Sequence, residues 1–283
     1  RVEAERDAAR WLPWLDKLPI ADLMQFGVLP KVRLTNTNRK TLLDAALKFF
    51  GVASPDDWDK VYARPQAAYR RTRTQQSDRG AIAAWLRIGE IKAERCECGP
   101  FDEIRFREAL TRIRALTADS PERFELEMIR LCAEAGVVLA LVPEIRRAHV
   151  SGAARWLNAR PVIQLSLYGK TNDRFWFTFF HEAGHILLHG RGEVFLDDIG
   201  ADGRESEFER DANQFAAKFL IPLASEPQLA SLTTEPEIRR FAQQLGIHPG
   251  IVVGRLQHDQ LLTYNTPLNR LKVSLRWVDQ TET

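Results

Sequence analysis

Residues 175–190 read FWFTFFHEAGHILLHG, and the rest of the chain is organised around this stretch. Within it, His181, Glu182 and His185 form the pattern H-E-x-x-H. Four residues advance an α-helix by about 400°, so the two histidines leave one helix face roughly 6 Å apart along its axis. Both imidazoles can then bind one tetrahedral Zn²⁺, and Glu182 lies beside the metal, where the general base for an attacking water is expected.

The residues around this pattern are apolar on nearly all sides, as in a helix that lies inside a protein core. They are Phe175, Trp176, Phe177, Phe179, Phe180, Ile186, Leu187 and Leu188. H-E-x-x-H specifies only three positions and also occurs by chance on surface helices. Two histidines and a glutamate inside a core helix, however, are costly unless a partner holds them. The stretch therefore predicts a buried metal site.

The composition is that of a folded globular protein. Of the 283 residues, 45% are hydrophobic and seven are tryptophan, which argues against disorder. No apolar run approaches the ~20 residues that span a bilayer, and the charged start of the chain contains no apolar signal segment. Three cysteines, an odd number, suit a reducing compartment. We therefore expect a cytoplasmic protein without a membrane span.

The net charge of +2 conceals an asymmetry between two parts of the chain. Residues 1–118 carry 22 Lys or Arg and 16 Asp or Glu, a balance of +6. Residues 119–283 carry 18 Lys or Arg and 22 Asp or Glu, a balance of −4. This shift places a boundary near residue 119. We expect a helical region at 1–118, a domain built on the metal helix at 119–265, and a tail with a possible strand at 266–283.

The N-terminal region reads as a set of helices without a catalytic motif. Residues 41–50 form an amphipathic pattern that Gly51 ends, and Ser54 followed by Pro55 starts another helix. Residues 69–79, YRRTRTQQSDR, are the most basic part and could contact phosphates. Because no aromatic ladder is interleaved with the charges, we favour a solvent-exposed helix end and loop.

The pattern changes after residue 119. The expected elements are helix 121–136, strands 137–142, 149–157 and 161–167, the metal helix from a cap at 171–173 to Gly190, helices 205–221, 237–245 and 249–258, and a last strand at 273–278. Gly152, inside the second strand, indicates close approach of another backbone. This order predicts an α+β fold in which a small, mostly antiparallel sheet packs on the metal helix.

A catalytic zinc site needs a third protein ligand in addition to the two histidines. His189 is near in sequence, but on a straight helix it lies about 12 Å from His181 along the axis, too far to share the metal. We expect it to cap the helix or to support a ligand, with the helix dipole favouring its charged form. The following helix offers Glu205, Glu207 and Glu209 as alternatives.

Glu209 is the best candidate because it borders the apolar stripe of its helix. Glu205 lies a turn away, and Glu207 points elsewhere. Asn213 lies one turn beyond Glu209 on the same face, where its amide can hydrogen-bond a ligand imidazole and fix its orientation. We therefore predict that Glu209 is the third zinc ligand and that Asn213 supports a histidine.

Two spaced motifs in this part of the chain carry a family resemblance. HEAGHILLH, followed by EFERDANQFAAKFLIP, resembles the ImmA/IrrE-type metallopeptidases, whose pattern is H-E-x-x-H and then E-x-x-A-N/D on the next helix. The resemblance covers residues 120–260 or thereabouts. It implies a zincin-like domain of the gluzincin kind, with zinc bound by His181, His185 and Glu209 and with Glu182 as the base.

The resemblance also implies a partner. Members of this family typically cleave a helix-turn-helix repressor and so relieve transcription in stress responses or mobile elements. Many are fused to an upstream DNA-binding domain of the XRE family, and residues 1–118 resemble the spacer after that domain in antitoxin-like fusions. No complete helix-turn-helix is visible here, so we expect the upstream domain to lie outside this chain and direct nucleic-acid binding to be weak.

We therefore expect a zinc endopeptidase that acts on a DNA-binding repressor. The alternative is an antitoxin-like regulator or partner-binding protein whose metal site is structural or vestigial. Glu182 separates the two, because a structural site does not need it. The substrate is expected to extend along a sheet edge at 152–155. An oxyanion-stabilising group is also required, and Tyr168, Arg155 and His258 are equal candidates.

Overall fold

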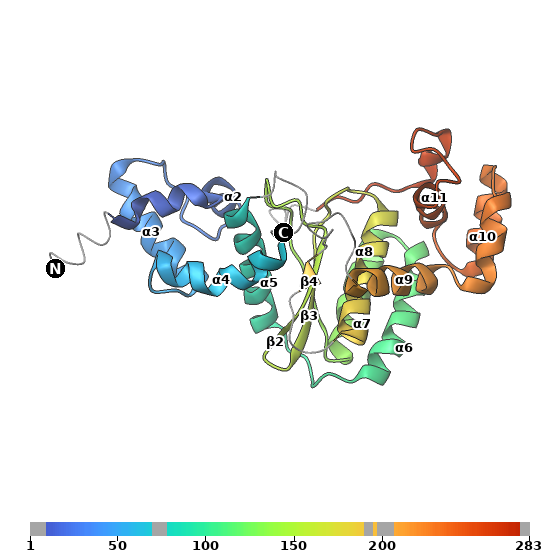
Figure 1. The fold of residues 1–283 in the computed structure, drawn as a ribbon, viewed down its shortest axis with the longest axis horizontal. Helices are drawn as coiled ribbons and strands as arrows, with labels where there is room; N and C mark the ends of the chain where they lie inside the picture. Colours follow the sequence, from blue (N-terminus) through green and yellow to red (C-terminus); the bar gives the residue numbers. More distant parts are fainter. Residues whose placement is uncertain (1–9, 70–77, 190–194, 197–206, 278–283) are drawn as a thin grey trace.

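The computed structural model describes residues 10–69, 78–189, 195–196 and 207–277. It has an α+β fold, in which a small sheet stands at the centre with helices on both of its sides (Figure 1). This confirms the predicted fold class. Within the described ranges, we find no helix that is long and apolar enough to cross a membrane.

The sheet has four strands in the order β1-β3-β2-β4. They are β1 (Val138–Leu141), β2 (Gly152–Leu157), β3 (Arg160–Leu165) and β4 (Phe195–Leu196). β2 and β3 form a hairpin, and Asn158 in its turn has a φ of 53°, a left-handed conformation that asparagine tolerates better than most residues. β1 pairs with β3 in parallel, whereas β2 is antiparallel to both of its neighbours. The sheet is therefore mixed.

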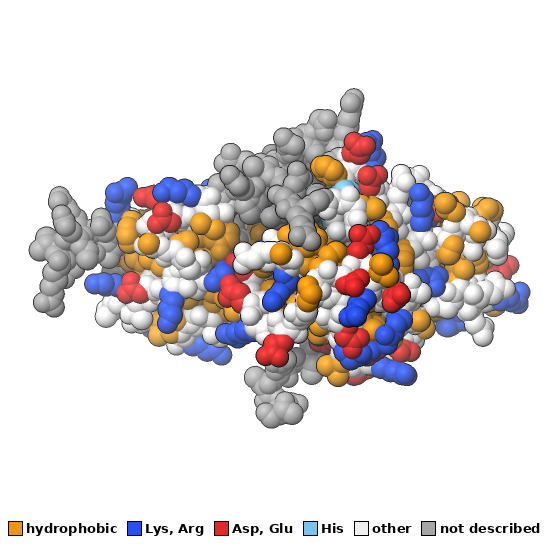
Figure 2. Space-filling model, turned by 90° about the horizontal axis from the view of Figure 1, so that it is seen from below, with side chains coloured by type: hydrophobic (Ala, Val, Ile, Leu, Met, Phe, Trp, Pro, Cys, Tyr) orange, Lys and Arg blue, Asp and Glu red, His pale blue; other side chains and the backbone are white. Residues whose placement is uncertain are grey.

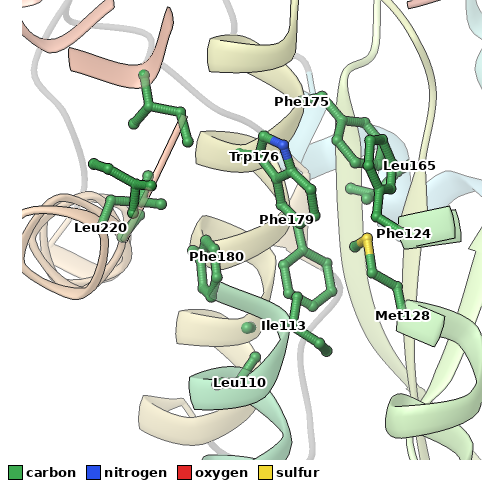
Figure 3. Packing of buried hydrophobic residues seen from close by; sticks show 14 of the residues in the cluster. Leu110, Ile113, Phe124, Met128, Leu165, Phe175, Trp176, Phe179, Phe180 and Leu220 are labelled. Atoms are coloured by element: carbon green, nitrogen blue, oxygen red, sulfur yellow. The ribbon is translucent and has the colours of Figure 1, made fainter. Parts of the chain in front are cut away.

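One face of the sheet carries the helix that contains H-E-x-x-H. This helix, α8 (Asn172–Leu188), contacts β2 and β3. It shares a hydrophobic core with α6 (Glu103–Ala115) and α7 (Pro121–Glu134), and a short 3₁₀ helix, η2 (Leu116–Ala118), joins those two. Figure 3 shows the aromatic side chains of α8 packed with Leu165 of β3 and with Phe124 and Met128 of α7. Most of the apolar residues around the motif thus bury the helix, as expected, but Leu188 at its end is exposed.

The opposite face of the sheet is covered by α5 (Arg79–Arg95) (Figure 1). Arg155 of β2 is buried between them. Its guanidinium donates hydrogen bonds to the Leu86 carbonyl and to Gln164 Oε1 at 2.6 and 3.0 Å, and pairs with Glu90 at 3.0 Å. Residues on both sides of position 119 therefore share one core and one buried polar network on this face.

Four helical segments precede α5 in the described part of the chain. They are η1 (Leu12–Lys17), α2 (Ile20–Gln25), α3 (Asn36–Phe50) and α4 (Pro55–Tyr69). Trp14, Phe50 and Trp58 come from three of these segments and pack edge to face, with ring centroids 5.7 to 5.9 Å apart. Of the basic stretch at 69–79, residues 70–77 lie outside the described ranges.

Among the described residues, helical segments after β4 lie on the side of α8 away from the sheet (Figure 1). They are α9 (Glu207–Leu220), η3 (Leu223–Ser231), α10 (Glu235–Leu245), α11 (Pro249–His258) and η4 (Pro267–Leu271). α9 and α11 both contact α8. The prediction of a strand at 273–278 is wrong for residues 273–277, the part that the structure describes. There, Ser274 forms a single β-bridge with Thr171. Thr171 directly precedes α8, so the ladder cannot extend.

Candidate metal centre

Three polar residues of α8 are buried in the protein core. His181, Glu182 and His185 expose 1%, 0% and 1% of their surface. α9 approaches α8 closely at Gly184, where a β-carbon would lie 3.2 Å from the Cα of Ala212. Two small residues at this crossing thus bring side chains of the two helices within reach of one another.

Glu209 reaches both histidines from the first turn of α9. Its Oε2 atom lies 3.2 Å from His181 Nε2, and its Oε1 atom lies 3.3 Å from His185 Nε2. The two Nε2 atoms are 3.0 Å apart. The structure therefore brings together the three side chains predicted as metal ligands, with their ligand atoms within 4.8 Å of one another. Glu207 is exposed, and Glu205 lies outside the described residues.

The second ring nitrogen of each histidine faces a neighbouring side chain. His181 Nδ1 lies 2.8 Å from Asn213 Oδ1; because an amide oxygen only accepts, Nδ1 carries the proton and Nε2 keeps its lone pair. His185 Nδ1 lies 2.9 Å from His189 Nδ1, and His189 Nε2 lies 3.8 Å from Asp211 Oδ2. A proton on His189 Nε2 faces the carboxylate, which leaves a lone pair on His189 Nδ1. This lone pair accepts a hydrogen bond from His185 Nδ1–H, so the lone pair of His185 is on Nε2.

The protonation states of the ligands follow from burial and from these contacts. Burial opposes the charged form of His185 and lowers its pKa to about 4. Burial also opposes ionisation of Glu209, but the neighbouring His181 and His185 rings outweigh it and lower the pKa of Glu209 to about 2. At neutral pH His185 is therefore neutral and Glu209 ionised, which are the states in which these side chains bind metals.

This donor set fits a divalent cation. Two imidazole lone pairs and a carboxylate converge on one region of the core, and a cation between them relieves their mutual repulsion. Two histidine nitrogens and one glutamate oxygen are a donor set of catalytic zinc sites, which leave a fourth position open. His181, His185 and Glu209 could therefore hold a metal ion.

Glu182 faces the sheet from a position next to these ligands. A β-carbon on Gly152, the first residue of β2, would lie 2.5 Å from Glu182 Oε1 and 2.9 Å from its Cγ. Gly152 thus leaves the space that the glutamate side chain occupies. The glycine was expected to admit another backbone; it admits the side chains of Glu182 and Thr178 instead.

His189 differs from the expectation in two respects. α8 ends at Leu188 rather than at Gly190, and His189 follows it with extended backbone angles, φ −116° and ψ 139°. Its ring nevertheless lies beside His185, with the two Nδ1 atoms 2.9 Å apart. The helix dipole was expected to favour its charged form, but burial lowers the pKa of His189, so desolvation outweighs the dipole here.

The strand predicted to bind a peptide along its edge is covered there. β4 pairs with β2 at Ala153 and Ala154, so an extended substrate cannot use that part of the edge while β4 is in place.

The three residues considered as oxyanion-stabilising groups lie in different parts of the structure. Arg155 lies on the other face of the sheet, His258 is exposed beside Asp259, and Tyr168 packs on His149 in the loops before β2 and α8.

Two histidines one turn apart on a core helix, with an adjacent buried glutamate and a carboxylate from the next helix, are the residue pattern used by H-E-x-x-H metallopeptidases. Residues 142–257 match the family Peptidase_M78, described as the IrrE N-terminal-like domain. No curated protein matches the chain. The matched range contains α8, α9 and the complete ligand set. The match supports the resemblance to the ImmA/IrrE family and indicates a peptidase-type function.

Proposed function

We propose that this chain is a zinc-dependent endopeptidase of the gluzincin kind. The observation that carries the proposal is the complete burial of Glu182 beside the converging side chains of His181, His185 and Glu209. A metal site that only stabilised the fold would need the ligands but not an additional carboxyl group in the core, where it is costly. The family match over residues 142–257 supports the same function.

Each side chain of the site has its own role in the proposed reaction. Zn²⁺ held by the three ligands would polarise the scissile carbonyl group and lower the pKa of a water molecule. Glu182 accepts a proton from the attacking water and passes it to the leaving amine. Gly152 sets the position of Glu182 from the sheet side. Asn213 and His189 contact the Nδ1 atoms of the two imidazoles, so that both Nε2 atoms face Glu209 and could bind the metal.

The proposed substrate is a cytoplasmic helix-turn-helix repressor, and its cleavage would relieve transcription in a stress response or a toxin–antitoxin system. This part rests on the resemblance to the ImmA/IrrE family. Sequence-specific DNA binding would belong to an upstream domain outside residues 1–283. Of residues 1–118, the helices before α5 would serve as spacer or docking region, because α5 and α6 pack with the sheet and α8. In line with this, the face in Figure 2 shows Lys and Arg side chains interspersed with Asp and Glu, not the concentrated positive surface of a DNA-binding face.

An inactive variant tests the substrate assignment. Glu182→Gln keeps the size of the side chain but removes the base, so the zinc-loaded variant should retain its substrate uncut and capture a repressor in a pull-down. In a reporter assay with that repressor, wild type should derepress transcription and Glu182→Gln should not. Glu207→Gln, which changes an exposed glutamate of α9, is the matched control. Equal derepression by wild type and Glu182→Gln, with zinc retained in both, would favour the antitoxin-like regulator instead.

A further inference from the structure

A cavity opens where β1 and β3 end. It has a volume of about 450 Å³ and is lined by the loop that joins β1 to β2 and by the loop that joins β3 to α8. Because β1 and β3 are parallel, their carboxyl ends lie at the same end of the sheet, next to these two loops. Arg147, His149, Tyr168 and Lys170 are among the lining residues.

The backbone of both loops is held in conformations that most residues avoid. Arg147, His149 and Lys170 have φ values of 68°, 52° and 55°, and Gly169 has a φ of 95°. A left-handed conformation costs a residue with a β-carbon about 1 kcal/mol or more. Such strain concentrates at functional sites. Three strained side-chain-bearing residues around one cavity therefore point to a binding role for it.

The charges around the cavity favour an anionic group. Lys170 has no ion-pair partner among the described residues, and Arg147 lies 3.9 Å from Asp78, a loose pair. Arg146, by contrast, is tied to Asp22 at 2.9 Å. The one acidic lining residue, Glu144, accepts a hydrogen bond from the Trp277 indole at 3.2 Å.

A further cation borders the cavity. The Arg174 side chain packs over Gly169, where a β-carbon would lie 2.6 Å from its Cδ and 2.9 Å from its Nη1. No ion pair of Arg174 is present among the described residues. The exposed cations of Lys170 and Arg174, with the loosely paired Arg147, are thus left to attract a negative charge.

The cavity is also close to the proposed catalytic base. His149 precedes Gly152 by three residues, which limits the separation of their Cα atoms to about 10 Å. Gly152 touches the Glu182 carboxyl group. A substrate that passes Glu182 in an extended conformation advances about 3.3 Å per residue, so it would reach the cavity within about three residues of the scissile bond.

We propose that this cavity is a specificity subsite that binds the carboxylate of an Asp or Glu side chain of the substrate, within about three residues of the cleaved bond. The proposal rests on the proposed peptidase function and names the class of sequence that the enzyme accepts. Lys170 and Arg147 would bind the carboxylate, and the two loops would shape the pocket around it.

Selection of binding peptides on an inactive variant tests the subsite independently of peptide cleavage. A random peptide display library is panned on immobilised, zinc-loaded Glu182→Gln protein, on Glu182→Gln/Lys170→Glu, and on Glu182→Gln/Lys48→Glu. Lys48 is an exposed lysine of α3, so the third protein has the same net charge as the second. The selected peptides are then incubated with zinc-loaded wild type, and the cleavage sites are mapped by mass spectrometry. Arg147→Glu provides a second test variant should Lys170→Glu alter folding.

We expect the peptides selected on Glu182→Gln and on Glu182→Gln/Lys48→Glu to be enriched in Asp or Glu at one position. Glu182→Gln/Lys170→Glu should bind the same peptides about tenfold more weakly. Cleavage should map within about three residues of the acidic position. Selected peptides without an acidic preference, no enrichment at all, or a preference that Lys170→Glu and Arg147→Glu both leave unchanged would overturn the subsite alone. Acidic peptides that bind but remain uncut by wild type would contradict the peptidase function, and with it the subsite.

Discussion

The Oε1 atom of Glu182 lies 2.5 Å from the position that a β-carbon would take on Gly152. This places the first residue of β2 directly against the proposed general base. The sheet therefore does more than bury α8, because the missing side chain at Gly152 determines where the Glu182 carboxyl group can lie. A small residue acts similarly on the side of α8 that faces α9, where Gly184 leaves space for Ala212 and Phe215 of α9.

Gly152→Ala should displace the base without removing the metal. The added methyl group overlaps Glu182, and a displacement of about 1 Å from a reactive geometry can cost about 100-fold in rate. We expect peptide hydrolysis to fall by that order while zinc content stays at the wild-type value. Gly99→Ala is the matched control, because no atom lies within 4 Å of a β-carbon there. Wild-type activity of Gly152→Ala would show that Gly152 does not set the base.

Glu209→Ala should lose zinc. Wild type is expected to bind about one zinc per chain, and a site with two of three protein ligands is far weaker. Elemental analysis after dialysis should find clearly substoichiometric zinc in Glu209→Ala and in His181→Ala. Glu207→Ala, an exposed position on the same helix, should keep its full content. Full occupancy in Glu209→Ala would instead assign the third ligand to another residue.

Asn213→Ala should weaken zinc binding without removing a ligand. The Asn213 amide oxygen accepts the His181 Nδ1–H hydrogen bond, and loss of such support typically lowers metal affinity by about 10- to 100-fold. Competition with a chelator of known affinity measures the change. Gln214→Ala, at the neighbouring exposed position, should match wild type. Equal affinity of Asn213→Ala and Gln214→Ala would mean that the hydrogen bond does not orient the ligand.

Much of this site could be predicted because helical periodicity fixes relative positions within one helix. His181 and His185 must share a face four residues apart. The apolar stripe of the next helix similarly singled out Glu209, and Asn213 lies one turn beyond it. These relationships are local, so they do not depend on how distant segments pack.

Other features depend on contacts between segments far apart in the chain and could not be predicted. Arg155 looks like a polar residue on a strand, yet it is buried against Glu90, 65 residues earlier. The order of the strands, and the cover that two-residue β4 provides for β2, likewise arise from tertiary packing. Asp211 of α9 faces His189 after the end of α8, a contact between two segments that no local pattern relates.

The metal-free protein should lose stability as pH falls from about 6.5 to about 4. Burial lowers the pKa of His185 to about 4 from an ordinary value of 6.5, so in this window the unfolded chain binds the proton more tightly than the folded chain does. The loss should reach at most on the order of 3 kcal/mol by pH 4.

Thermal unfolding in chelator at several pH values measures this loss. His185→Gln should reduce the slope of the unfolding midpoint against pH between 6.5 and 4. Exposed His258→Gln should preserve it. Identical slopes in wild type and His185→Gln would contradict the neutral, buried state of this histidine.

The most direct measurement of the central claim compares peptide hydrolysis by wild type and Glu182→Gln at equal zinc content. A chymotryptic peptide mixture is incubated with each protein, and new termini are quantified by mass spectrometry, with zinc measured in the same samples. If Glu182 is the base of a zinc endopeptidase, wild type cuts peptides and the variant is slower by about 10²- to 10⁴-fold. Equal product formation by the two zinc-loaded proteins, or none by either, would contradict that claim.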